Sequence, residues 1–132
     1  MKKSIILVLC LSVFFCLMAC QQADTHQEKE AVYMNINAQQ AKEIMDTQEN
    51  YVILDVRTQE EFDEKHIPGA VLIPDYEITN KAEEILKDKD QLILVYCRSG
   101  RRSKLASEEL LKLGYTNIKE FGGIIDWPYE TE

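Results

Sequence analysis

The chain has 132 residues, with 23 acidic against 15 basic side chains and a formal net charge of −8. A chain this acidic is a poor candidate for binding nucleic acid or for clinging electrostatically to anionic lipid. Its length fits one small domain with one hydrophobic core and leaves no room for a second.

The chain begins with a pattern that predicts export. Lys2 and Lys3 precede an uncharged apolar run over residues 5–19, as in a secretory signal peptide. The run is shorter than the roughly 20 residues that cross a bilayer as a helix, so a permanent transmembrane anchor is the weaker interpretation. Removing this segment takes away two lysines and no acidic residue, which leaves the remainder still more acidic.

The end of this segment, "LMAC" at residues 17–20, resembles the lipobox of bacterial lipoproteins, in which the cysteine is lipidated and becomes the mature N-terminus. The resemblance implies a signal peptide over 1–19, then a lipidated Cys20 with a flexible polar tether over 20–31, then a domain over 32–132. The protein would be exported and attached by lipid to the bacterial cell envelope, facing the periplasm or the exterior. Plain cleavage and an uncleaved anchor remain the alternatives.

Cysteine usage narrows the chemistry. Cys10 and Cys16 would leave with the signal and Cys20 would be acylated, so Cys97 would be the only free thiol. An unpaired cysteine in an exported protein is either buried and inert or kept for its reactivity.

Beyond the tether, apolar runs alternate with helical patterns. In chain order the sequence predicts a strand over 32–36, a helix over 38–47, a strand over 51–56, a helix over 59–64, a strand over 70–74, a helix over 81–88, a strand over 91–97, a helix over 103–113 and a strand over 115–121. This alternation is typical of an α/β domain with a mainly parallel sheet. The runs at 51–56 and 91–97 are apolar on both pleat faces, which favours central strands covered by helices on each side.

Local signals mark the helix ends. Three helix starts have capping-box spacing: Asn37 with Gln40, Thr58 with Glu61, and Asn80 with Glu83. Gly114 follows the last helix at the position where a left-handed residue is wanted.

This order places Cys97 at the C-terminal end of a central strand, where open α/β sheets form ligand sites. The loop that follows brings together residues able to act on an anion: Arg98, Ser99, Gly100, Arg101 and Arg102. The arginines, the loop amides and the next helix N-terminus all favour a thiolate over a thiol. We therefore predict a nucleophilic Cys97; a buried structural cysteine beside a solvated basic patch is the alternative.

Three motifs resemble rhodanese-type sulfurtransferases. "CRSGRRS" at 97–103 resembles their active-site loop, "LDVRTQEEFDEKHIPGA" at 54–70 their N-terminal signature, and "GGIIDWPY" at 122–129 their C-terminal end. One departure is Lys65, where the family usually has glycine before His66. The resemblance implies a single rhodanese-like α/β domain, with a central, mainly parallel five-stranded sheet flanked by helices on both faces.

Loop length separates two chemistries that share this scaffold. Cysteine-dependent phosphatases need arginine six residues after the cysteine, a position that Ser103 occupies here, whereas Arg102 lies five residues after Cys97. By resemblance, the shorter loop implies transfer of sulfur. The Cys97 thiolate would take the outer sulfur of a small anionic donor such as thiosulfate and pass it from a persulfide to cyanide or a thiol acceptor. No metal or organic cofactor is implied.

The loop residues receive individual roles. Planar guanidinium groups bind oxyanions bidentately, so Arg101 and Arg102 are expected to hold the sulfonate of the donor. Arg98 is expected to act as a more distant electrostatic lure, while Ser99, Gly100 and the loop amides stabilise the persulfide.

Three further residues are expected to support the site. Asp55 and Arg57 are two apart in an extended segment, so they face the same side and can pair with each other or brace nearby loops. His66 invites the role of general base, but it lies in a turn and an arginine-rich loop needs no base. An acid/base or substrate role for these residues remains the alternative.

Two rival functions remain open. One is a non-catalytic or persulfide-presenting rhodanese module that docks to a partner in the envelope; the intact Cys97 and its complete loop count against it. The other is a redox-linked thiol enzyme or a reductase for oxyanions such as arsenate. The lack of a second, resolving cysteine counts against that one.

Overall fold

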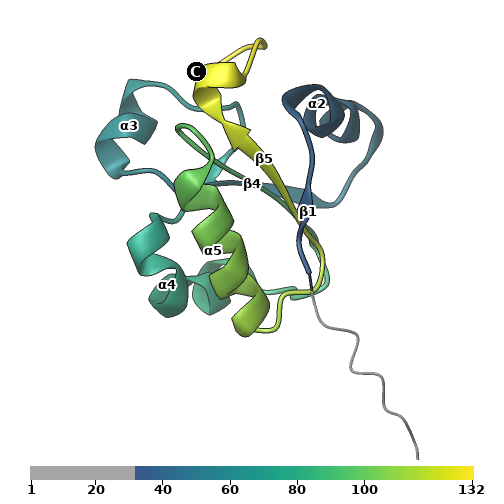
Figure 1. Cartoon of the computed structure of the whole chain (residues 1–132), viewed down its shortest axis with the longest axis vertical. Coiled ribbons are helices and arrows are strands. Elements are labelled where there is room, and N and C mark those ends of the chain that lie inside the picture. The colour runs from purple at the N-terminus through teal and green to yellow at the C-terminus, as the bar shows by residue number, and fades with distance from the viewer. Residues whose placement is uncertain (1–31) are drawn as a thin grey trace, which may run out of the picture.

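The computed structural model describes residues 32–132, which form one five-stranded sheet in which every pairing is parallel (Figure 1). The strand order is β1-β5-β4-β2-β3. The strands are β1 (Met34–Asn35), β2 (Tyr51–Asp55), β3 (Val71–Leu72), β4 (Leu92–Cys97) and β5 (Ile118–Gly123). The predicted α/β class with a parallel five-stranded sheet is confirmed.

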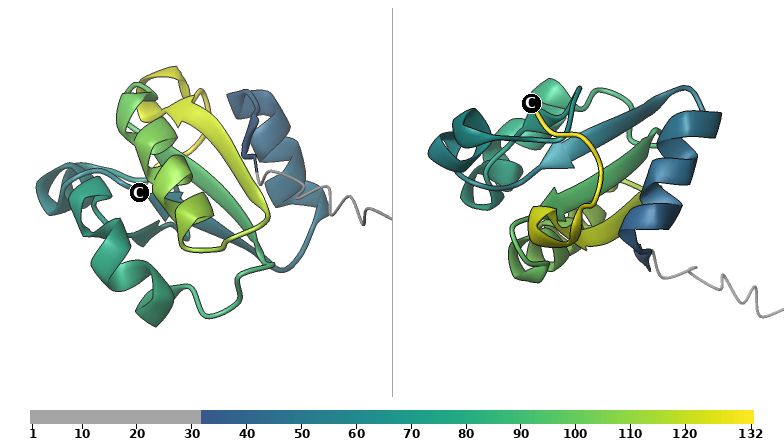
Figure 2. Two further views of the ribbon diagram at one scale, coloured as in Figure 1. Left: turned by 60° about the horizontal axis from the view of Figure 1, so that its bottom comes forward. Right: turned by 90° about the horizontal axis from the view of Figure 1, so that it is seen from above.

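Helices cover both faces of the sheet, as Figure 2 shows from two sides. They are α2 (Ala38–Thr47), α3 (Gln59–Glu64), α4 (Ile78–Ile85) and α5 (Arg101–Lys112), with short 3-10 turns at η1 (Asp75–Glu77) and η2 (Ile124–Asp126). One half of the core lies between the sheet and α4 and α5, and the other half lies under α2.

The central strand β4 is buried along its whole length, as its unbroken apolar run predicts. Because side chains alternate along a strand, Tyr96 points into the half of the core under α2, whereas Val95 and Cys97 point toward α4 and α5. This alternation sets the thiol on the face that α5 covers.

Two of the three predicted capping boxes are confirmed. The Asn37 side chain accepts a hydrogen bond from the Gln40 amide at 2.8 Å, and the Gln40 side chain accepts one from the Asn37 amide at 2.9 Å. Thr58 and Glu61 make the same reciprocal pair at the start of α3. Gly114 has φ +90°, the left-handed conformation expected after α5.

The predicted start of α4 is wrong. The helix begins at Ile78, continues directly from η1, and has no side-chain cap, so Asn80 lies inside it. Both Ile78 and Ala82 are fully buried against the sheet. Apolar burial outweighed the local capping signal at Asn80, which is worth only about 1 kcal/mol.

Two other boundaries near the site differ from the sequence prediction. Helix α5 begins at Arg101 rather than Ser103, so Arg101 and Arg102 belong to its first turn. Strand β5 begins at Ile118 rather than Tyr115, because Tyr115 is buried and its hydroxyl donates to the Leu86 carbonyl at 2.8 Å.

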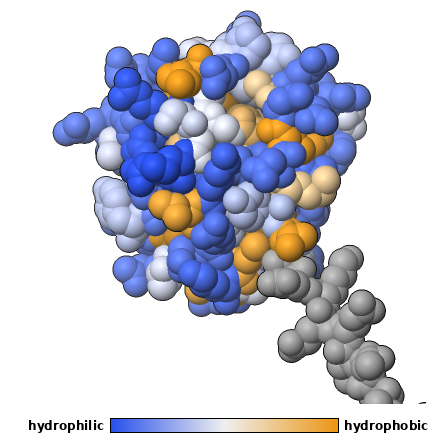
Figure 3. Space-filling view, viewed as in Figure 1, coloured by the Kyte–Doolittle hydropathy of each residue, from blue (hydrophilic) through white to orange (hydrophobic). Residues whose placement is uncertain are grey.

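The predicted signal peptide, lipidated Cys20 and tether lie outside the described residues. Within residues 32–132, no helix is both long enough and apolar enough to cross a membrane. On the face drawn in Figure 3, apolar side chains form separate patches among hydrophilic ones.

Candidate active site

Cys97 ends strand β4 at the bottom of the loop that leads into α5, and it is only 1 % exposed. The Gly100 amide donates to its sulfur at 3.0 Å, and the Ser103 hydroxyl lies 3.4 Å from it. Burial acts to raise the pKa of the Cys97 thiol. Hydrogen bonds from the Ser103 hydroxyl and from the amides of Ser103, Gly100 and Ser99 outweigh burial, so its pKa lies below its ordinary value.

These hydrogen bonds, rather than arginine charge, are the main cause of the lowered pKa of Cys97. Arg98 and Arg101 are exposed, and neither side chain forms an ion pair or hydrogen bond with another residue in the described part of the chain. Of the predicted loop residues, the structure places Ser99 and Gly100 in contact with the thiol through their backbone amides. These amides and Ser103 are what chiefly stabilise the thiolate.

Arg102 is held by a carboxylate from another helix. Its two terminal nitrogens donate to the two oxygens of Glu61, each at 2.8 Å, in a bidentate pair that joins α5 to α3. Glu61 also closes the capping box of α3 with Thr58. The guanidinium that we expected to bind a donor anion is therefore already paired with a carboxylate.

This pair gives the protein an acid-sensitive link. The hydrogen bonds from Arg102 lower the pKa of Glu61 from 4.5 to about 2. A lowered carboxyl pKa adds stability above pH 4.5, and that stability is lost as the pH falls toward 2.

We expect the melting temperature of Glu61→Gln to fall less steeply than that of wild type as the pH is lowered from 4.5 toward 2. Glutamine keeps the capping box; exposed Glu43→Gln is the control, and equal slopes would contradict the prediction.

The loop also rests against the end of strand β5. Gly123 pairs with Cys97 across the sheet, and the Ile125 amide donates to the Arg98 carbonyl at 3.3 Å. A Cβ atom on Gly123 would lie 2.0 Å from that carbonyl oxygen and 2.5 Å from the Ser99 Cα. The site therefore depends on a glycine outside the loop itself.

Sequence reasoning missed a buried carboxylate beneath the loop. Glu120, on β5, is 2 % exposed; its Oε1 lies 2.5 Å from the Ser103 hydroxyl oxygen and accepts from the Gly122 amide at 2.9 Å. Strand alternation puts it on the same face as buried Ile118. That period of two is the signal that could have identified an acidic side chain pointing inward.

The structure pairs the predicted supports Asp55 and Arg57. The buried guanidinium donates to the carboxylate at 2.6 Å and to the Lys65 carbonyl at 2.8 Å, and it lies 5.6 Å from the centre of the Tyr96 ring. This arrangement fits the bracing of nearby loops better than an acid/base or substrate role. The pair ties the end of β2 to the segment after α3.

His66 is placed away from the thiol. Its Nδ1 lies 2.9 Å from the Phe62 carbonyl oxygen, its ring stacks on Phe62 at 3.8 Å, and its Nε2 lies 3.4 Å from a Glu132 carboxylate oxygen. Between residues 32 and 132 these contacts leave no hydrogen bond from His66 to Cys97. The histidine connects α3 to the C-terminal segment.

The loop, the strand-end cysteine and the flanking motifs agree with one family. The sequence profile described as "Rhodanese-like domain" matches residues 37–128. The chain belongs to the rhodanese family. It is 39 % identical over 98 residues to the "putative sulfur carrier protein YrkF" of Bacillus subtilis, covering 74 % of this chain and 52 % of that protein. The chain thus spans about half the length of this relative.

Further comparisons agree with rhodanese chemistry and fold. The chain is 37 % identical over 73 residues to "thiosulfate sulfurtransferase PspE" of Escherichia coli, covering 55 % of this chain and 70 % of that one. A rhodanese-related protein of Thermoplasma volcanium superposes with a TM-score of 0.66 at 31 % identity, covering 76 % of this chain and 98 % of that chain. The family and these relatives support sulfur transfer as the general activity.

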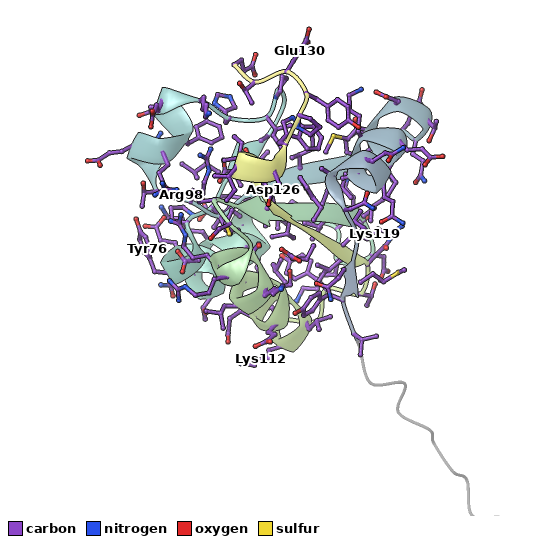
Figure 4. The ribbon with its side chains drawn as sticks, turned by 45° about the horizontal axis from the view of Figure 1, so that its top comes forward. Tyr76, Arg98, Lys112, Lys119, Asp126 and Glu130 are labelled. Atoms are coloured by element: carbon purple, nitrogen blue, oxygen red, sulfur yellow. The ribbon has the colours of Figure 1, made fainter. Side chains whose placement is uncertain are left out.

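A cavity of about 290 Å³ adjoins the rhodanese loop. Its lining combines both charge signs with two apolar residues: Arg57, Glu61, Glu64, Lys65, Arg98, Ile124 and Ile125. Figure 4 labels Arg98 on the side of the molecule that carries α3. Within the described residues no group of three or more His, Cys, Asp or Glu side chains is arranged to hold a metal ion.

Proposed function

We propose that this protein is a thiosulfate sulfurtransferase that works through a persulfide on Cys97. The observation that carries the proposal is the Gly100 amide, which points at the sulfur from 3.0 Å within a loop that lowers the pKa of the thiol. A stabilised thiolate at a strand end is the nucleophile that such a reaction needs. The name of the Escherichia coli relative supports thiosulfate as the donor.

The proposed reaction has two displacements. The Cys97 thiolate attacks the outer sulfur of thiosulfate, the S–S bond breaks, and sulfite leaves with the electron pair. Cyanide or an acceptor thiolate then attacks the outer sulfur of the persulfide, and Cys97 leaves as a thiolate. Amides directed at Cys97 stabilise negative charge both before the first step and after the second.

Sulfite release tests the proposal directly. Purified residues 21–132, whose one cysteine is Cys97, are mixed with thiosulfate, with and without cyanide, and released sulfite is measured alongside the intact mass. We expect catalytic release with cyanide and, without it, a mass gain of one sulfur atom on Cys97. A stable persulfide without turnover would favour the persulfide-presenting module, and the absence of both would reject the sulfurtransferase.

Arg101, whose guanidinium has no ion-pair or hydrogen-bond partner among residues 32–132, is the better candidate for receiving the donor sulfonate, since Arg102 is paired with Glu61. We expect Arg101→Ala to raise the KM for thiosulfate up to about fivefold, as for an exposed ion pair, and the effect to shrink with added salt. Thiosulfate kinetics at two ionic strengths measure it. Lys104→Ala, an exposed cation one helical turn farther along α5, is the matched control; equal effects would indicate non-specific steering.

We further propose that Cys20 is lipidated and that the domain is carried on the outer side of a bacterial cell membrane. The lipobox-like residues 17–20 support this proposal, as does the polar stretch between Cys20 and the domain. Membrane fractionation of wild type and Cys20→Ala tests it. We expect the variant to lose lipid-dependent processing, and equal processing and membrane retention would favour an uncleaved anchor instead.

A further inference from the structure

A buried hydroxyl lies between the reactive thiol and a buried carboxylate. The Ser103 hydroxyl oxygen is 3.4 Å from the Cys97 sulfur and 2.5 Å from Oε1 of Glu120. Ser103 is fully buried and Glu120 is 2 % exposed. The three polar groups form a continuous chain on the face of the sheet that α5 covers.

The number of hydrogen atoms in this chain limits its states. The Ser103 hydroxyl carries one hydrogen, and the carbonyls of Gly100 and Gly122 are its other neighbours, at 3.0 and 3.3 Å. When Glu120 is ionised, the Ser103 hydroxyl donates its hydrogen to Oε1 of Glu120, and the Cys97 thiol can then donate to the serine oxygen. When Cys97 is ionised, the serine donates to sulfur, and its oxygen is left to accept a hydrogen from a protonated Glu120.

We propose that Cys97 and Glu120 share one proton through Ser103, with Glu120 as the internal acceptor of the thiol proton. In the transfer, the S–H bond of Cys97 breaks and its proton moves to the serine oxygen. The serine O–H bond breaks in turn and its proton moves to Oε1 of Glu120. One proton has changed sites, no electron has been gained or lost, and no proton has crossed the loop to solvent.

Both end states use the serine hydrogen and the shared proton fully, whereas the doubly ionised state does not. The Gly122 amide donates to Oε1 of Glu120 at 2.9 Å, and the amides of Ser99, Gly100 and Ser103 donate to the sulfur, so each anion keeps backbone donors in every state. With both groups ionised, the single serine hydrogen can serve only one of them. Two buried anions that compete for one hydrogen ionise in two separate steps.

Other ionisable groups face this chain from the neighbouring elements. Burial raises the pKa of Tyr33, which precedes β1, and the negative charges of Glu108 on α5 and then of Glu120 raise it further. Arg102 on α5 feels the charge of Cys97 and of Asp75 in η1, but its guanidinium is paired with Glu61. Among the described residues, only Ser103 is hydrogen-bonded by its side chain to both Cys97 and Glu120.

The inference rests on the proposed function only for its use: after sulfur delivery, Cys97 leaves as a thiolate, and Glu120 would return the shared proton to it. Glu120 acts through Ser103 and is therefore a positioning residue rather than a group that touches the substrate. Its effect should appear in the protonation of Cys97 itself, without any sulfur donor.

Thiolate ultraviolet absorbance against pH tests the shared proton, with each protein corrected by its own Cys97→Ser version. Wild type should show two rises separated by a plateau, where one proton is divided between two sites. Glu120→Gln keeps the shape and an acceptor oxygen for Gly122 but cannot take a proton. The thiolate absorbance of this variant should rise only once, and below the pH of that rise the thiolate fraction should fall about tenfold per pH unit. Ser103→Ala should draw the two rises together and serves if the glutamine variant fails to fold.

Glu108→Gln is the matched control, because it removes the same charge from the same neighbourhood without contacting Ser103; it should keep two rises. A single rise in wild type, or two unchanged rises in Glu120→Gln, would overturn the shared proton. Sulfite release measured on the same samples keeps the two proposals separate. Two rises without sulfite release would reject the sulfurtransferase and leave the shared proton standing.

Discussion

Serine in place of Cys97 should reduce sulfur transfer to less than about 1 % of wild type, because a hydroxyl cannot carry a persulfide. The fold should persist. The Gly100 amide that donates to sulfur at 3.0 Å can donate to a serine oxygen, and the replaced side chain is of nearly the same size. Sulfite release from thiosulfate with cyanide and the melting temperature measure the two effects.

The control for this loss is Ser107→Ala, which lies on the same face of α5 as Ser103. Ser107 is buried, and its hydroxyl bonds only to the Ser103 carbonyl, at 2.8 Å, among the described residues. Its removal should change stability by about 1 kcal/mol and leave sulfur transfer within a few-fold of wild type. Turnover above about 1 % in Cys97→Ser would show that another residue is the nucleophile. A mass gain of one sulfur atom that persists in Cys97→Ser would show the same.

The sequence could predict those parts of the fold that depend on neighbouring residues. The capping boxes at Asn37 and Thr58 are made by side chains three residues apart, and both form. The unbroken apolar run of β4 favours a strand covered on both faces, and it is one. These signals place Cys97 at a strand end before any coordinates are known.

Long-range contacts explain what the sequence could not predict. Helix α4 starts at Ile78 because a buried face spans that residue and Ala82, and no local signal reveals which residues the sheet will cover. Tyr115 leaves β5 because its hydroxyl reaches Leu86, which is 29 residues away in the chain. Both boundaries are set by tertiary packing, which outweighs local preference.

The same distinction applies to the candidate site. The spacing of the arginines after Cys97 is visible in the sequence, but the partner of Arg102 is Glu61, 41 residues away, on another helix. Proximity along the chain suggested that arginine charge lowers the pKa of the thiol, whereas the folded loop does so mainly through Ser103 and backbone amides. Which groups donate hydrogen bonds to the thiol depends on the folded structure, and the number of charged residues nearby in the sequence does not reveal it.

The second large effect is expected from Gly123→Ala, a change outside the loop. A Cβ atom there would lie 2.0 Å from the Arg98 carbonyl oxygen, far inside ordinary contact, and the atoms it meets in Arg98 and Ser99 belong to the backbone. The loop must therefore move away from β5 by about an ångström, and a shift of that size at a reacting group costs about 100-fold in rate. We expect this loss in sulfite release, together with a higher pKa of Cys97 as the Gly100 and Ser99 amides withdraw.

Its neighbour Gly122 provides the matched control, because the two glycines present opposite problems. Gly122 has φ +87° with nothing within 4 Å of an added Cβ, whereas Gly123 has an ordinary extended φ of −133° and a backbone collision. Gly122→Ala should therefore cost about 1–2 kcal/mol of backbone strain and lower the melting temperature while leaving turnover per folded molecule nearly unchanged. Gly123→Ala should lose turnover even where it remains folded. If the two variants lose turnover equally, the contact between the loop and β5 does not position Cys97.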